Sequence, residues 1–534
     1  MITIYDIALA IMKATCQILS KGDTMKKLIK LYTGRFVWIS LAIVLQVGWT
    51  FLILFFLSAN YAPVSAALTL LSLLILIPII ERPASPEVKM AWAIPILIFP
   101  FFGGILYLMS GASKPRRKMR RALAEQQSRS SALLPDGKRA IEQIRKICPA
   151  DAGQFVYLTS QGYPCYVGKR TQFYSSGEHA FPDMLAALES AEKYIFIEYF
   201  IINRGKMWDA VLEILERKVA QGVEVKVIYD DVGSMRGLPH AYDKVLEKKG
   251  IGCIRFNPYR PVYSMIMNNR DHRKYMIVDG RIGFTGGINL ADEYINQEQR
   301  FGYWKDNAVL IEGDAVRGMT LSFLQLWNAR CKKGSAVSPE AYLLPMTEQD
   351  VGQGFVTPYA DAPVDSEYLA ENVYLNIINN ATEYLYIATP YLIIDSAMQS
   401  ALTLAAKRGV DVRIVLPAIP DKKVVNQVTK SHYAVLLESG VSIYEYTPGF
   451  IHEKCLVCDG KIATVGTVNL DYRSLYLHYE NGCVFYGGDI ISKVHDNMQQ
   501  NFAVSKRITK VNKRQGLLIS RIYYAIIRLL APVM

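Results

Sequence analysis

The chain carries the stretch DHRKYMIVDGRIGFTGGINL at residues 271–290 and a second version of it, IHEKCLVCDGKIATVGTVNL, at residues 451–470. The two stretches align without a gap. The matching residues are His272, Lys274, Asp279, Gly286 and Asn289 in the first stretch and His452, Lys454, Asp459, Gly466 and Asn469 in the second. Chance agreement at five such positions is very improbable, and an internal repeat of this kind indicates two lobes of one design.

The segments before these stretches repeat as well. One pair, AEKYIFIEYFII from Ala191 and GVEVKVIYD from Gly222, matches a later pair, ATEYLYIATPYLII from Ala381 and GVDVRIVLP from Gly409. Each pair reads as a strand, a helix and a second strand, because short β-branched and aromatic runs alternate with helical periods. The sequence therefore predicts an α/β fold from about residue 150 onward, with a polar, turn-rich linker near residues 333–355.

The histidine and lysine of each stretch are two positions apart, which places them on the same face of a strand. The aspartate seven positions after the histidine has the opposite parity, so we expect Asp279 and Asp459 to be structural. If the two lobes meet around a pseudo-twofold axis, two imidazoles, two ammonium groups and two carboxamides converge.

These groups suit the cleavage of a phosphodiester. One histidine attacks phosphorus to give a phosphohistidine, while the other protonates the leaving alkoxide and then deprotonates the incoming alcohol. The predicted phosphate-binding residues are Lys274, Asn289, Lys454 and Asn469, which stabilise the charged oxygens. Because the lysines supply positive charge and no carboxylates cluster at metal-ligand spacing, no metal or other cofactor is expected.

The remaining histidines and the cysteines show no comparable pattern. The histidines His179, His240, His432, His478 and His495 stand in no repeated context and are expected to be ordinary polar or packing residues. Cys455 and Cys458 form a C-x-x-C, but residues three apart in a strand face opposite ways, so neither zinc nor redox chemistry is expected there.

Charge and composition favour a lipid partner. Lys and Arg total 60 against 48 Asp and Glu, and this formal charge of +12 suits either nucleic acid or an anionic membrane. Hydrophobic residues make up 51% of the chain, which is more than a soluble enzyme of this charge needs.

Apolar stretches at residues 36–59, 61–80 and 90–109 each approach the roughly 20 residues that span a bilayer as a helix. They predict an N-terminal membrane-anchoring helical region, and hence a multi-pass protein of the cell membrane. The basic flanks are Lys26, Lys27, Lys30 and Arg35 before the first stretch and Lys114, Arg116, Arg117, Lys118, Arg120 and Arg121 after the third. Both flanks favour the cytoplasm, which three full crossings cannot satisfy. Either the third stretch, which contains Pro95 and Pro100, is re-entrant or interfacial, or the first lies flat.

The paired stretches resemble the HKD motifs, H-x-K-x4-D, of the phospholipase D superfamily. The resemblance is closer to its bacterial cardiolipin synthase branch and covers nearly the whole chain. It is carried by AWAIPILIFPFFGGILYLMSG from Ala91, YFII from Tyr199, GVEVKVIYDDVGS from Gly222, GFTGGINLADEYIN from Gly283, GYWKDN from Gly302, TPYLIIDSAMQSALTLAAKRGVDVRIVLP from Thr389 and YTPGFIHEK from Tyr446. The extended N-terminus departs from the family pattern.

The resemblance implies two pseudo-symmetric αβαβα lobes with the reaction centre at their interface. The implied catalytic residues are the motif residues His272, Lys274, Asp279, His452, Lys454 and Asp459. Asp306 in YWKDN and Glu480 in HYENG would orient the histidines. The resemblance favours His272 as nucleophile and His452 as acid and base, although the residues alone are symmetric on this point.

The expected domains follow from the repeat and the apolar stretches. They are a membrane region at residues 1–121, a linker helix at 122–150, a first lobe at 151–335, a second lobe at 336–514 and an amphipathic interfacial helix at 515–534.

The resemblance also implies a reaction, in which a phosphatidyl group passes from one phosphatidylglycerol to another to give cardiolipin and glycerol. The implied partners are phosphatidylglycerol and an anionic bilayer, and not nucleic acid. Hydrolysis, and phosphatidylethanolamine as donor, stay open as alternatives. A phosphodiesterase acting on nucleic acid would not need the apolar stretches, and an inactive lipid-binding scaffold would not need two complete motifs.

Overall fold

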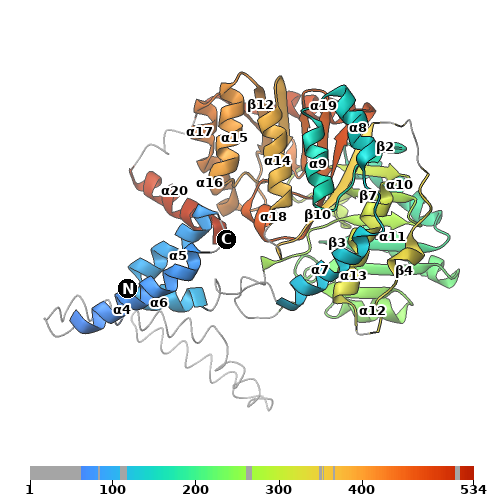
Figure 1. The fold of residues 1–534 in the computed structure, drawn as a ribbon, viewed down its shortest axis with the longest axis horizontal. Helices are drawn as coiled ribbons and strands as arrows, with labels where there is room; N and C mark the ends of the chain where they lie inside the picture. Colours follow the sequence, from blue (N-terminus) through green and yellow to red (C-terminus); the bar gives the residue numbers. More distant parts are fainter. Residues whose placement is uncertain are drawn as a thin grey trace, which may run out of the picture. The chain divides into compact units, whose positions relative to one another are not determined.

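The structure is a computed structural model that describes residues 48, 62–81, 85–108, 117–259, 268–332, 334–347, 352, 354–364, 367–510 and 518–533. The chain divides into two compact units. One is an N-terminal unit within Met1–Lys114, and the other, called the main body below, comprises Pro115–Tyr259 and Asn268–Met534 (Figure 1).

The N-terminal unit contains the packed helices α4 (Ala62–Ile80), α5 (Pro86–Ile98) and α6 (Pro100–Leu106). The apolar stretch predicted at residues 90–109 is therefore not one helix. It breaks at Phe99, because Pro100 has no N–H to continue the ladder and restricts the residue before it.

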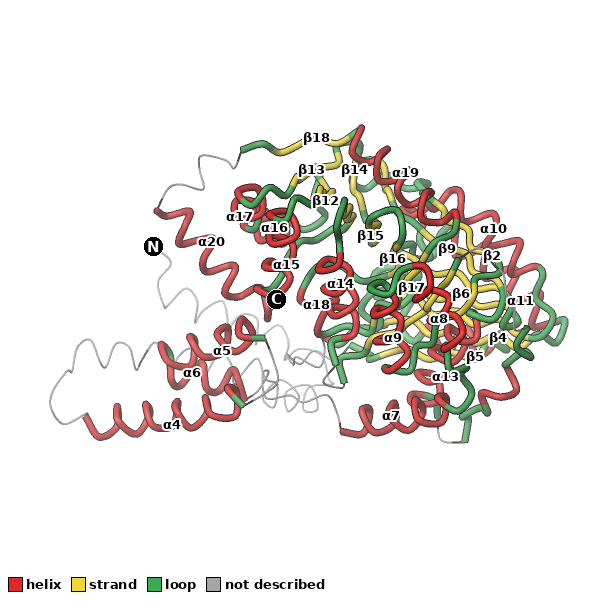
Figure 2. The backbone as a smooth tube through the Cα atoms, turned by 45° about the horizontal axis from the view of Figure 1, so that its top comes forward, coloured by secondary structure: helices red, strands yellow, loops and turns green. Residues whose placement is uncertain are grey.

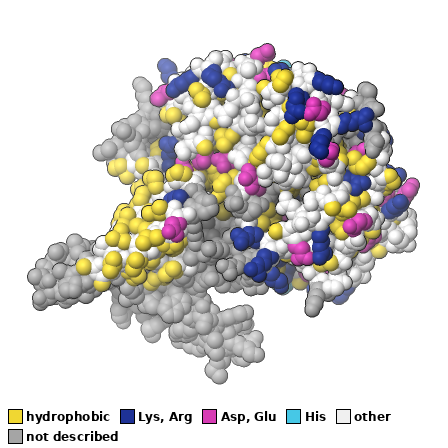
Figure 3. All heavy atoms as spheres, in the orientation of Figure 1, with side chains coloured by type: hydrophobic (Ala, Val, Ile, Leu, Met, Phe, Trp, Pro, Cys, Tyr) yellow, Lys and Arg dark blue, Asp and Glu magenta, His cyan; other side chains and the backbone are white. Residues whose placement is uncertain are grey.

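No described helix is both long and apolar enough to cross a membrane, so the structure gives no support to the predicted crossings at residues 61–80 and 90–109. The stretch at 36–59 lies outside the described residues apart from Gly48. Apolar side chains are nevertheless concentrated on the surface of α4 and α5 (Figure 3), where the exposed residues include Leu70, Leu71, Leu74, Ile77, Ile80, Leu97 and Ile98.

The first lobe of the main body is built on a seven-stranded sheet in the order β2-β9-β7-β6-β3-β4-β5. The strands are β2 (Arg170–Tyr174), β3 (Tyr194–Tyr199), β4 (Glu224–Asp230), β5 (Gly252–Phe256), β6 (Tyr275–Val278), β7 (Ile282–Gly286) and β9 (Ala308–Glu312). The helices are α10 (Gly177–Glu189), α11 (Lys206–Ala220), α12 (Tyr242–Lys248) and α13 (Val316–Arg330), with a 3-10 turn η4 (Asp292–Ile295). The strands β3, β4 and β5 are parallel, and the others pair antiparallel.

The second lobe is built on a nine-stranded sheet in the order β1-β10-β17-β16-β15-β11-β12-β13-β18. The strands are β1 (Tyr166–Val167), β10 (Phe355–Asp361), β11 (Tyr384–Ala388), β12 (Asp411–Pro417), β13 (Ser442–Tyr446), β15 (Cys455–Cys458), β16 (Ile462–Gly466), β17 (Glu480–Tyr486) and β18 (Ser505–Ile508). The helices are α14 (Leu369–Asn380), α15 (Ser396–Lys407), α16 (Lys423–Ser431), α17 (Tyr433–Glu438), α18 (Tyr472–Tyr476) and α19 (Asp489–Ala503). From β10 to β13 the order and directions repeat those from β2 to β5, which confirms the two-lobed α/β fold.

Further elements of the main body are α7 (Arg117–Ser131), α8 (Lys138–Ile147), α9 (Ala152–Ser160), the 3-10 turn η5 (Pro339–Tyr342), α20 (Leu518–Leu530), the 3-10 turn η7 (Ala531–Val533) and a two-stranded sheet of β8 (Tyr303–Lys305) and β14 (Gly449–Ile451). Residues 138–167 belong with the second lobe, although the sequence placed them before and at the start of the first. Ile144 and Phe155 lie in that lobe's core, and β1 pairs with β10. The chain thus passes along the second lobe before it builds the first.

The two lobes share a buried core at their interface. It joins Phe196 and Val309 of the first lobe to Tyr386 and Phe485 of the second, and Figure 2 shows the strands of both sheets inside the main body with helices around them. Cys455 contributes to this shared core, whereas Cys458 lies in the second lobe's own core. The two cysteines therefore face opposite sides of β15, as their spacing predicts.

Candidate active site

Each HKD stretch folds as a hairpin whose turn is fixed by its aspartate. Asp279 has a positive φ of 51°, and its carboxylate accepts hydrogen bonds from the N–H groups of Glu192, Lys193 and Tyr194 at 2.7–2.8 Å. Asp459 does the same at the start of β11. Burial favours the protonated carboxyls, but these N–H groups outweigh it and lower both pKa values. The structure therefore does not bring the two aspartates into the reaction centre. They are structural, as their parity predicts.

The histidines lie at the other end of these hairpins, and each is held by a carboxylate of the opposite lobe. His272 Nδ1 lies 2.9 Å from Glu480 Oε2 and 3.0 Å from Oε1. His452 Nδ1 lies 2.7 Å from Asp306 Oδ2. The family resemblance implied both acids as the residues that orient the histidines. The exchange between lobes leaves the Nε2 atom of each imidazole for chemistry.

The backbone fixes this exchange. His272 N–H donates to Tyr479 O at 2.9 Å, and the next residue, Glu480, binds the imidazole. In the same way His452 N–H donates to Lys305 O at 2.7 Å, and Asp306 follows. The short parallel pair of β8 (Tyr303–Lys305) and β14 (Gly449–Ile451) continues this contact.

The two lysines are buried in the same centre. Lys274 Nζ donates to His272 O at 2.8 Å, and Lys454 Nζ donates to His452 O. Burial lowers the pKa of Lys274 to about 8 and that of Lys454 to about 7, although Glu480 and Asp306 oppose this shift. A bound phosphate would replace some of the lost solvation and favour the charged lysines.

The two predicted phosphate-binding asparagines differ in their contacts. Asn289 accepts from Ile201 N–H at 3.0 Å and donates to the Tyr294 hydroxyl at 2.7 Å, so it also fixes the loop after β3. Asn469 Oδ1 is buried and has no hydrogen-bond partner within the described part of the chain.

The two orienting acids have unequal surroundings. Glu480 also accepts from the Thr467 hydroxyl, and the equivalent residue beside Asp306 is Gly287. A Cβ at Gly287 would lie 2.0 Å from Asp306 Oδ1. Aspartate is one methylene shorter than glutamate, so its carboxylate lies closer to the neighbouring backbone and only glycine fits.

The pKa values of the two acids also differ. Burial alone favours a protonated Glu480, but the imidazoles of His272 and His478 outweigh it and hold its pKa well below the ordinary value. Burial raises the pKa of Asp306 to about 7, although Lys454 and the amide of Asn307 oppose this. Burial also lowers the pKa of both His272 and His452 well below the ordinary value.

One further residue, His478, belongs to this centre. His478, expected to be ordinary, packs on His272 with their ring centroids 5.4 Å apart, and its Nδ1 lies 3.4 Å from Glu480 Oε1. The equivalent residue two positions before Asp306 is Trp304, which packs on His452 at the same separation of 5.4 Å. Both segments lie outside the HKD stretches. An alignment of HYEN at residues 478–481 with WKDN at residues 304–307 would have shown that His478 holds the same position as Trp304.

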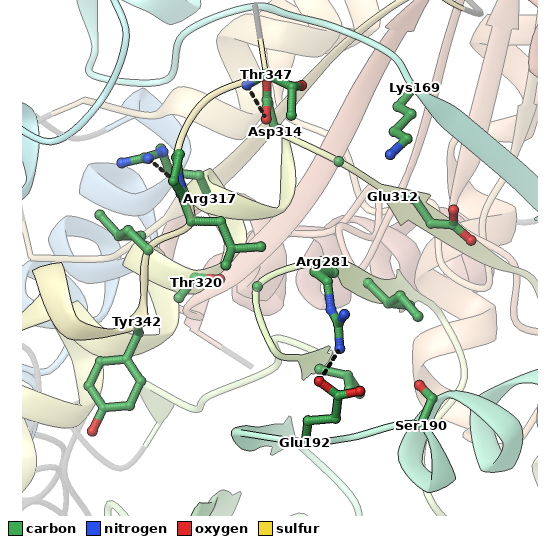
Figure 4. Close-up of a pocket in the computed structure, with 17 residues that line it drawn as sticks. Lys169, Ser190, Glu192, Arg281, Glu312, Asp314, Arg317, Thr320, Tyr342 and Thr347 are labelled. Atoms are coloured by element: carbon green, nitrogen blue, oxygen red, sulfur yellow. Dashed lines mark hydrogen bonds and ion pairs between the residues drawn. The ribbon is translucent and has the colours of Figure 1, made fainter.

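A cavity of about 520 Å³ lies at the turn end of the first-lobe hairpin (Figure 4). It is lined by Gly280 and Arg281, which follow β6, whereas His272 precedes β6. Arg317 at its edge donates to the carbonyls of Leu133 and Leu344. The cavity is therefore separate from the histidine centre.

Comparisons with known proteins agree with this geometry. Residues 184–327 and 374–502 match the family described as "Cardiolipin synthase, PLD-like domain", and residues 67–111 match "Phospholipase_D-nuclease N-terminal". The chain is 40% identical over 444 residues to an uncharacterized protein of Streptococcus mutans, covering 83% of this chain and 96% of that one. It is 34% identical to a cardiolipin synthase of Geobacillus thermodenitrificans, covering 84% and 89%.

A solved structure shares the fold. The phosphatidylserine synthase of Haemophilus influenzae aligns with a TM-score of 0.54 at 15% identity, covering 69% of this chain and 97% of that one. At this identity the likeness describes the two-lobed architecture alone.

Proposed function

The chain belongs to the cardiolipin synthase family of the phospholipase D superfamily, and we propose that it joins two phosphatidylglycerol molecules to give cardiolipin and glycerol. As a family member it is a phosphatidyltransferase of the phospholipase D type that synthesises phospholipid. The choice of phosphatidylglycerol as both donor and acceptor is our proposal.

The crossed pairing of the histidines with Glu480 and Asp306 carries the proposal. A carboxylate on Nδ1 holds the ring hydrogen there and directs the Nε2 lone pair outward. Glu480 stays ionised, which favours His272 as the nucleophile. Asp306 has a pKa of about 7, so the pair that it forms with His452 retains a proton near neutral pH and suits an acid and base.

In the first step His272 Nε2 attacks the phosphorus of one phosphatidylglycerol. The bond from phosphorus to the glycerol headgroup oxygen breaks, and His452 gives that oxygen a proton, so glycerol leaves. In the second step a hydroxyl of another phosphatidylglycerol attacks the phosphohistidine, His452 takes its proton, and the bond from phosphorus to His272 breaks. The products are cardiolipin and free enzyme.

Lys274 and Lys454 carry the electrostatic part of this mechanism. Their buried ammonium groups lie next to the two histidines, where they can stabilise the oxygens of the pentacoordinate phosphorus. We propose that this charge takes the place of a metal ion, and that a chelator leaves the rate of transfer unchanged.

We also propose that the N-terminal unit holds the enzyme at the membrane. The match at residues 67–111 and the exposed apolar side chains of α4 and α5 support this attachment. A site kept at the bilayer meets lipid alcohol at high local concentration, so transfer to lipid outcompetes hydrolysis. The basic residues that flank the apolar stretches support a cytoplasmic main body.

The experiment that tests the function is a product analysis. Purified protein is incubated with phosphatidylglycerol in mixed micelles, with and without EDTA, and the lipids and glycerol are measured by mass spectrometry. We expect cardiolipin and glycerol in equal amounts in both samples. Phosphatidic acid as the main product would instead show a hydrolase, and loss of turnover with EDTA, restored by one ion, would show a metal enzyme.

A further inference from the structure

His478 and Trp304 hold equivalent positions in the two halves of the centre, but their side chains differ in chemistry. The structure puts Trp304 on His452 and His478 on His272 at equal ring separations. Trp304 offers His452 and Asp306 a packing surface, whereas His478 offers His272 and Glu480 a further nitrogen ligand. Only the His272 half of the centre thus has two imidazoles and a carboxylate together.

The imidazole of His478 is buried and only partly satisfied. Its side chain is 9% exposed, its Nδ1 lies 3.4 Å from Glu480 Oε1, and its Nε2 has no hydrogen-bond partner among the residues that the structure describes. A buried polar group in this state is costly and points to a ligand that satisfies it.

The three side chains already stand close to the arrangement of a metal site. His272, His478 and Glu480 each offer one ligand atom within 4.8 Å of the others, and all three are buried. Bonds of about 2.0–2.1 Å to a tetrahedral zinc ion separate its ligands by roughly 3.3 Å. Glu480 lies 2.9 Å from His272 Nδ1 and 3.4 Å from His478 Nδ1, and the ligand atoms of the two imidazoles lie within 4.8 Å of each other, so the two rings must rotate toward each other to share one ion.

The ligand types select the ion. Two imidazoles and one carboxylate are a ligand set for zinc, and they leave a fourth position open. Magnesium and calcium prefer oxygen ligands and are not favoured here. The ammonium groups of Lys274 and Lys454 oppose any cation, so the affinity depends on all three ligands.

Binding of zinc at this place changes the nucleophile. Coordination through Nδ1 moves the single ring hydrogen of neutral His272 to Nε2, and a protonated Nε2 has no lone pair with which to attack phosphorus. Zinc also takes Glu480 away from its orienting role. We propose that His272, His478 and Glu480 form a zinc site that reversibly blocks phosphatidyl transfer. The metal site stands on geometry alone, whereas its inhibitory effect rests on the proposed function.

Two measurements on the full-length protein in detergent test this site. Calorimetric titration with zinc gives the number and affinity of bound ions, and titration with Co²⁺ gives the visible absorption that tetrahedral coordination produces. Zinc is also titrated against turnover of phosphatidylglycerol. The variants are His478→Asn, which removes the ligand, and His478→Phe, which places an aromatic ring there as in the other half. The control is His495→Asn, which changes a half-buried histidine of α19 outside the histidine centre.

We expect the wild type and His495→Asn to bind one zinc ion more than His478→Asn does, or to bind it at least about 100-fold more tightly, because a direct ligand is lost. Turnover should fall at least tenfold when this site fills, and each His478 variant should resist zinc relative to its own metal-free rate. Zinc bound by cysteines is the same in all variants, so the difference in zinc binding between variants reports on His478. Thermal unfolding shows which His478 variant is folded.

Equal zinc binding by wild type and a folded His478 variant would overturn the site. Zinc that binds through His478 without slowing turnover would overturn the inhibition. If no lipid product forms under any condition, the proposed function fails, and calorimetry still decides the metal site.

Discussion

Glu480 and Asp306 hold equivalent places, yet they leave the two catalytic histidines unequal. Glu480 is bound by His272 and by the Thr467 hydroxyl, whereas Asp306 lies against Gly287, which has no hydroxyl. The HKD motifs themselves are symmetric. In the proposed mechanism the residues around the motifs distinguish the nucleophile from the acid, whereas the motifs alone left this assignment open.

Replacing the carboxylate that orients the nucleophile tests this reasoning. We expect Glu480→Gln to slow single-turnover formation of the phosphohistidine by about 100- to 10,000-fold, because a neutral amide neither fixes the Nδ1–H tautomer nor offsets the charge that develops on His272. Rates are measured with labelled phosphatidylglycerol, and the unfolding midpoint of the variant serves as the control for folding. A rate within threefold of the wild type would show that Glu480 does not act through His272.

The lysines predict the pH dependence. A lysine is charged below its pKa, so Lys454, with a pKa of about 7, and Lys274, with a pKa of about 8, lose charge as the pH rises through this window. We expect kcat/KM to fall between about pH 7 and 9, since the phosphodiester does not titrate there. The rate of phosphatidylglycerol turnover is measured over this pH range for the wild type and for Lys454→Arg. The arginine variant serves as the comparison because its guanidinium stays charged over the whole range. A flat profile would contradict the role given to the lysines.

Among single residues, the sequence could predict the repeated residues of the HKD stretches but not the side chains that they contact in the other lobe. Strand parity places His272 with Lys274 and turns Asp279 away, and the structure agrees. Parity within one lobe says nothing of the other lobe, so neither the exchange of acids nor the contact of His478 with His272 could be read from it.

Among the elements, α20 has an apolar surface that is partly buried and partly exposed. The expected amphipathic helix forms at Leu518–Leu530, and its Ile527 is buried against Val428 of α16. The same helix leaves Ile522 and Ile526 half exposed, at 53% and 51%. The sequence showed an apolar face but could not show that part of it is used for packing on the second lobe.

This division predicts how α20 contributes to lipid binding. In a protein that starts at Pro115, the double substitution of Ile522→Ser with Ile526→Ser should weaken binding to phosphatidylglycerol vesicles by about tenfold or more, because each removes roughly 1 kcal/mol of apolar burial. Sedimentation measures the binding. The matched control, Leu404→Ser with Val504→Ser, removes exposed apolar residues of α15 and the end of α19. Equal loss in both double variants would leave α20 without a specific membrane role.

In the whole molecule, the repeat predicted two lobes, and the structure shows that each lobe completes the histidine site of the other. Each lobe supplies a histidine and the acid that orients the other lobe's histidine. The N-terminal unit was less well predicted. Composition alone gave three apolar stretches. The third of them breaks at Phe99 because Pro100, the first residue of α6, cannot continue the hydrogen bonds of α5.

The side of the membrane on which the main body lies has a direct test. The basic flanks predict the cytoplasm, so a cysteine placed at the exposed Glu125 should not react in intact cells with a maleimide that cannot cross the membrane. It should react after the cells are permeabilised, with the unsubstituted protein as the background for native cysteines. Labelling in intact cells would place the main body outside.

In the proposed mechanism a phosphatidyl group resides on one histidine, held by the acid of the other lobe, between donor and acceptor lipids. Rapid acid quenching of enzyme with labelled phosphatidylglycerol, followed by peptide mass spectrometry, locates that group. We predict an adduct on His272, none on His452, and loss of the adduct in His272→Asn. An adduct on His452, or cardiolipin formation at full rate with no histidine adduct, would rule out this mechanism.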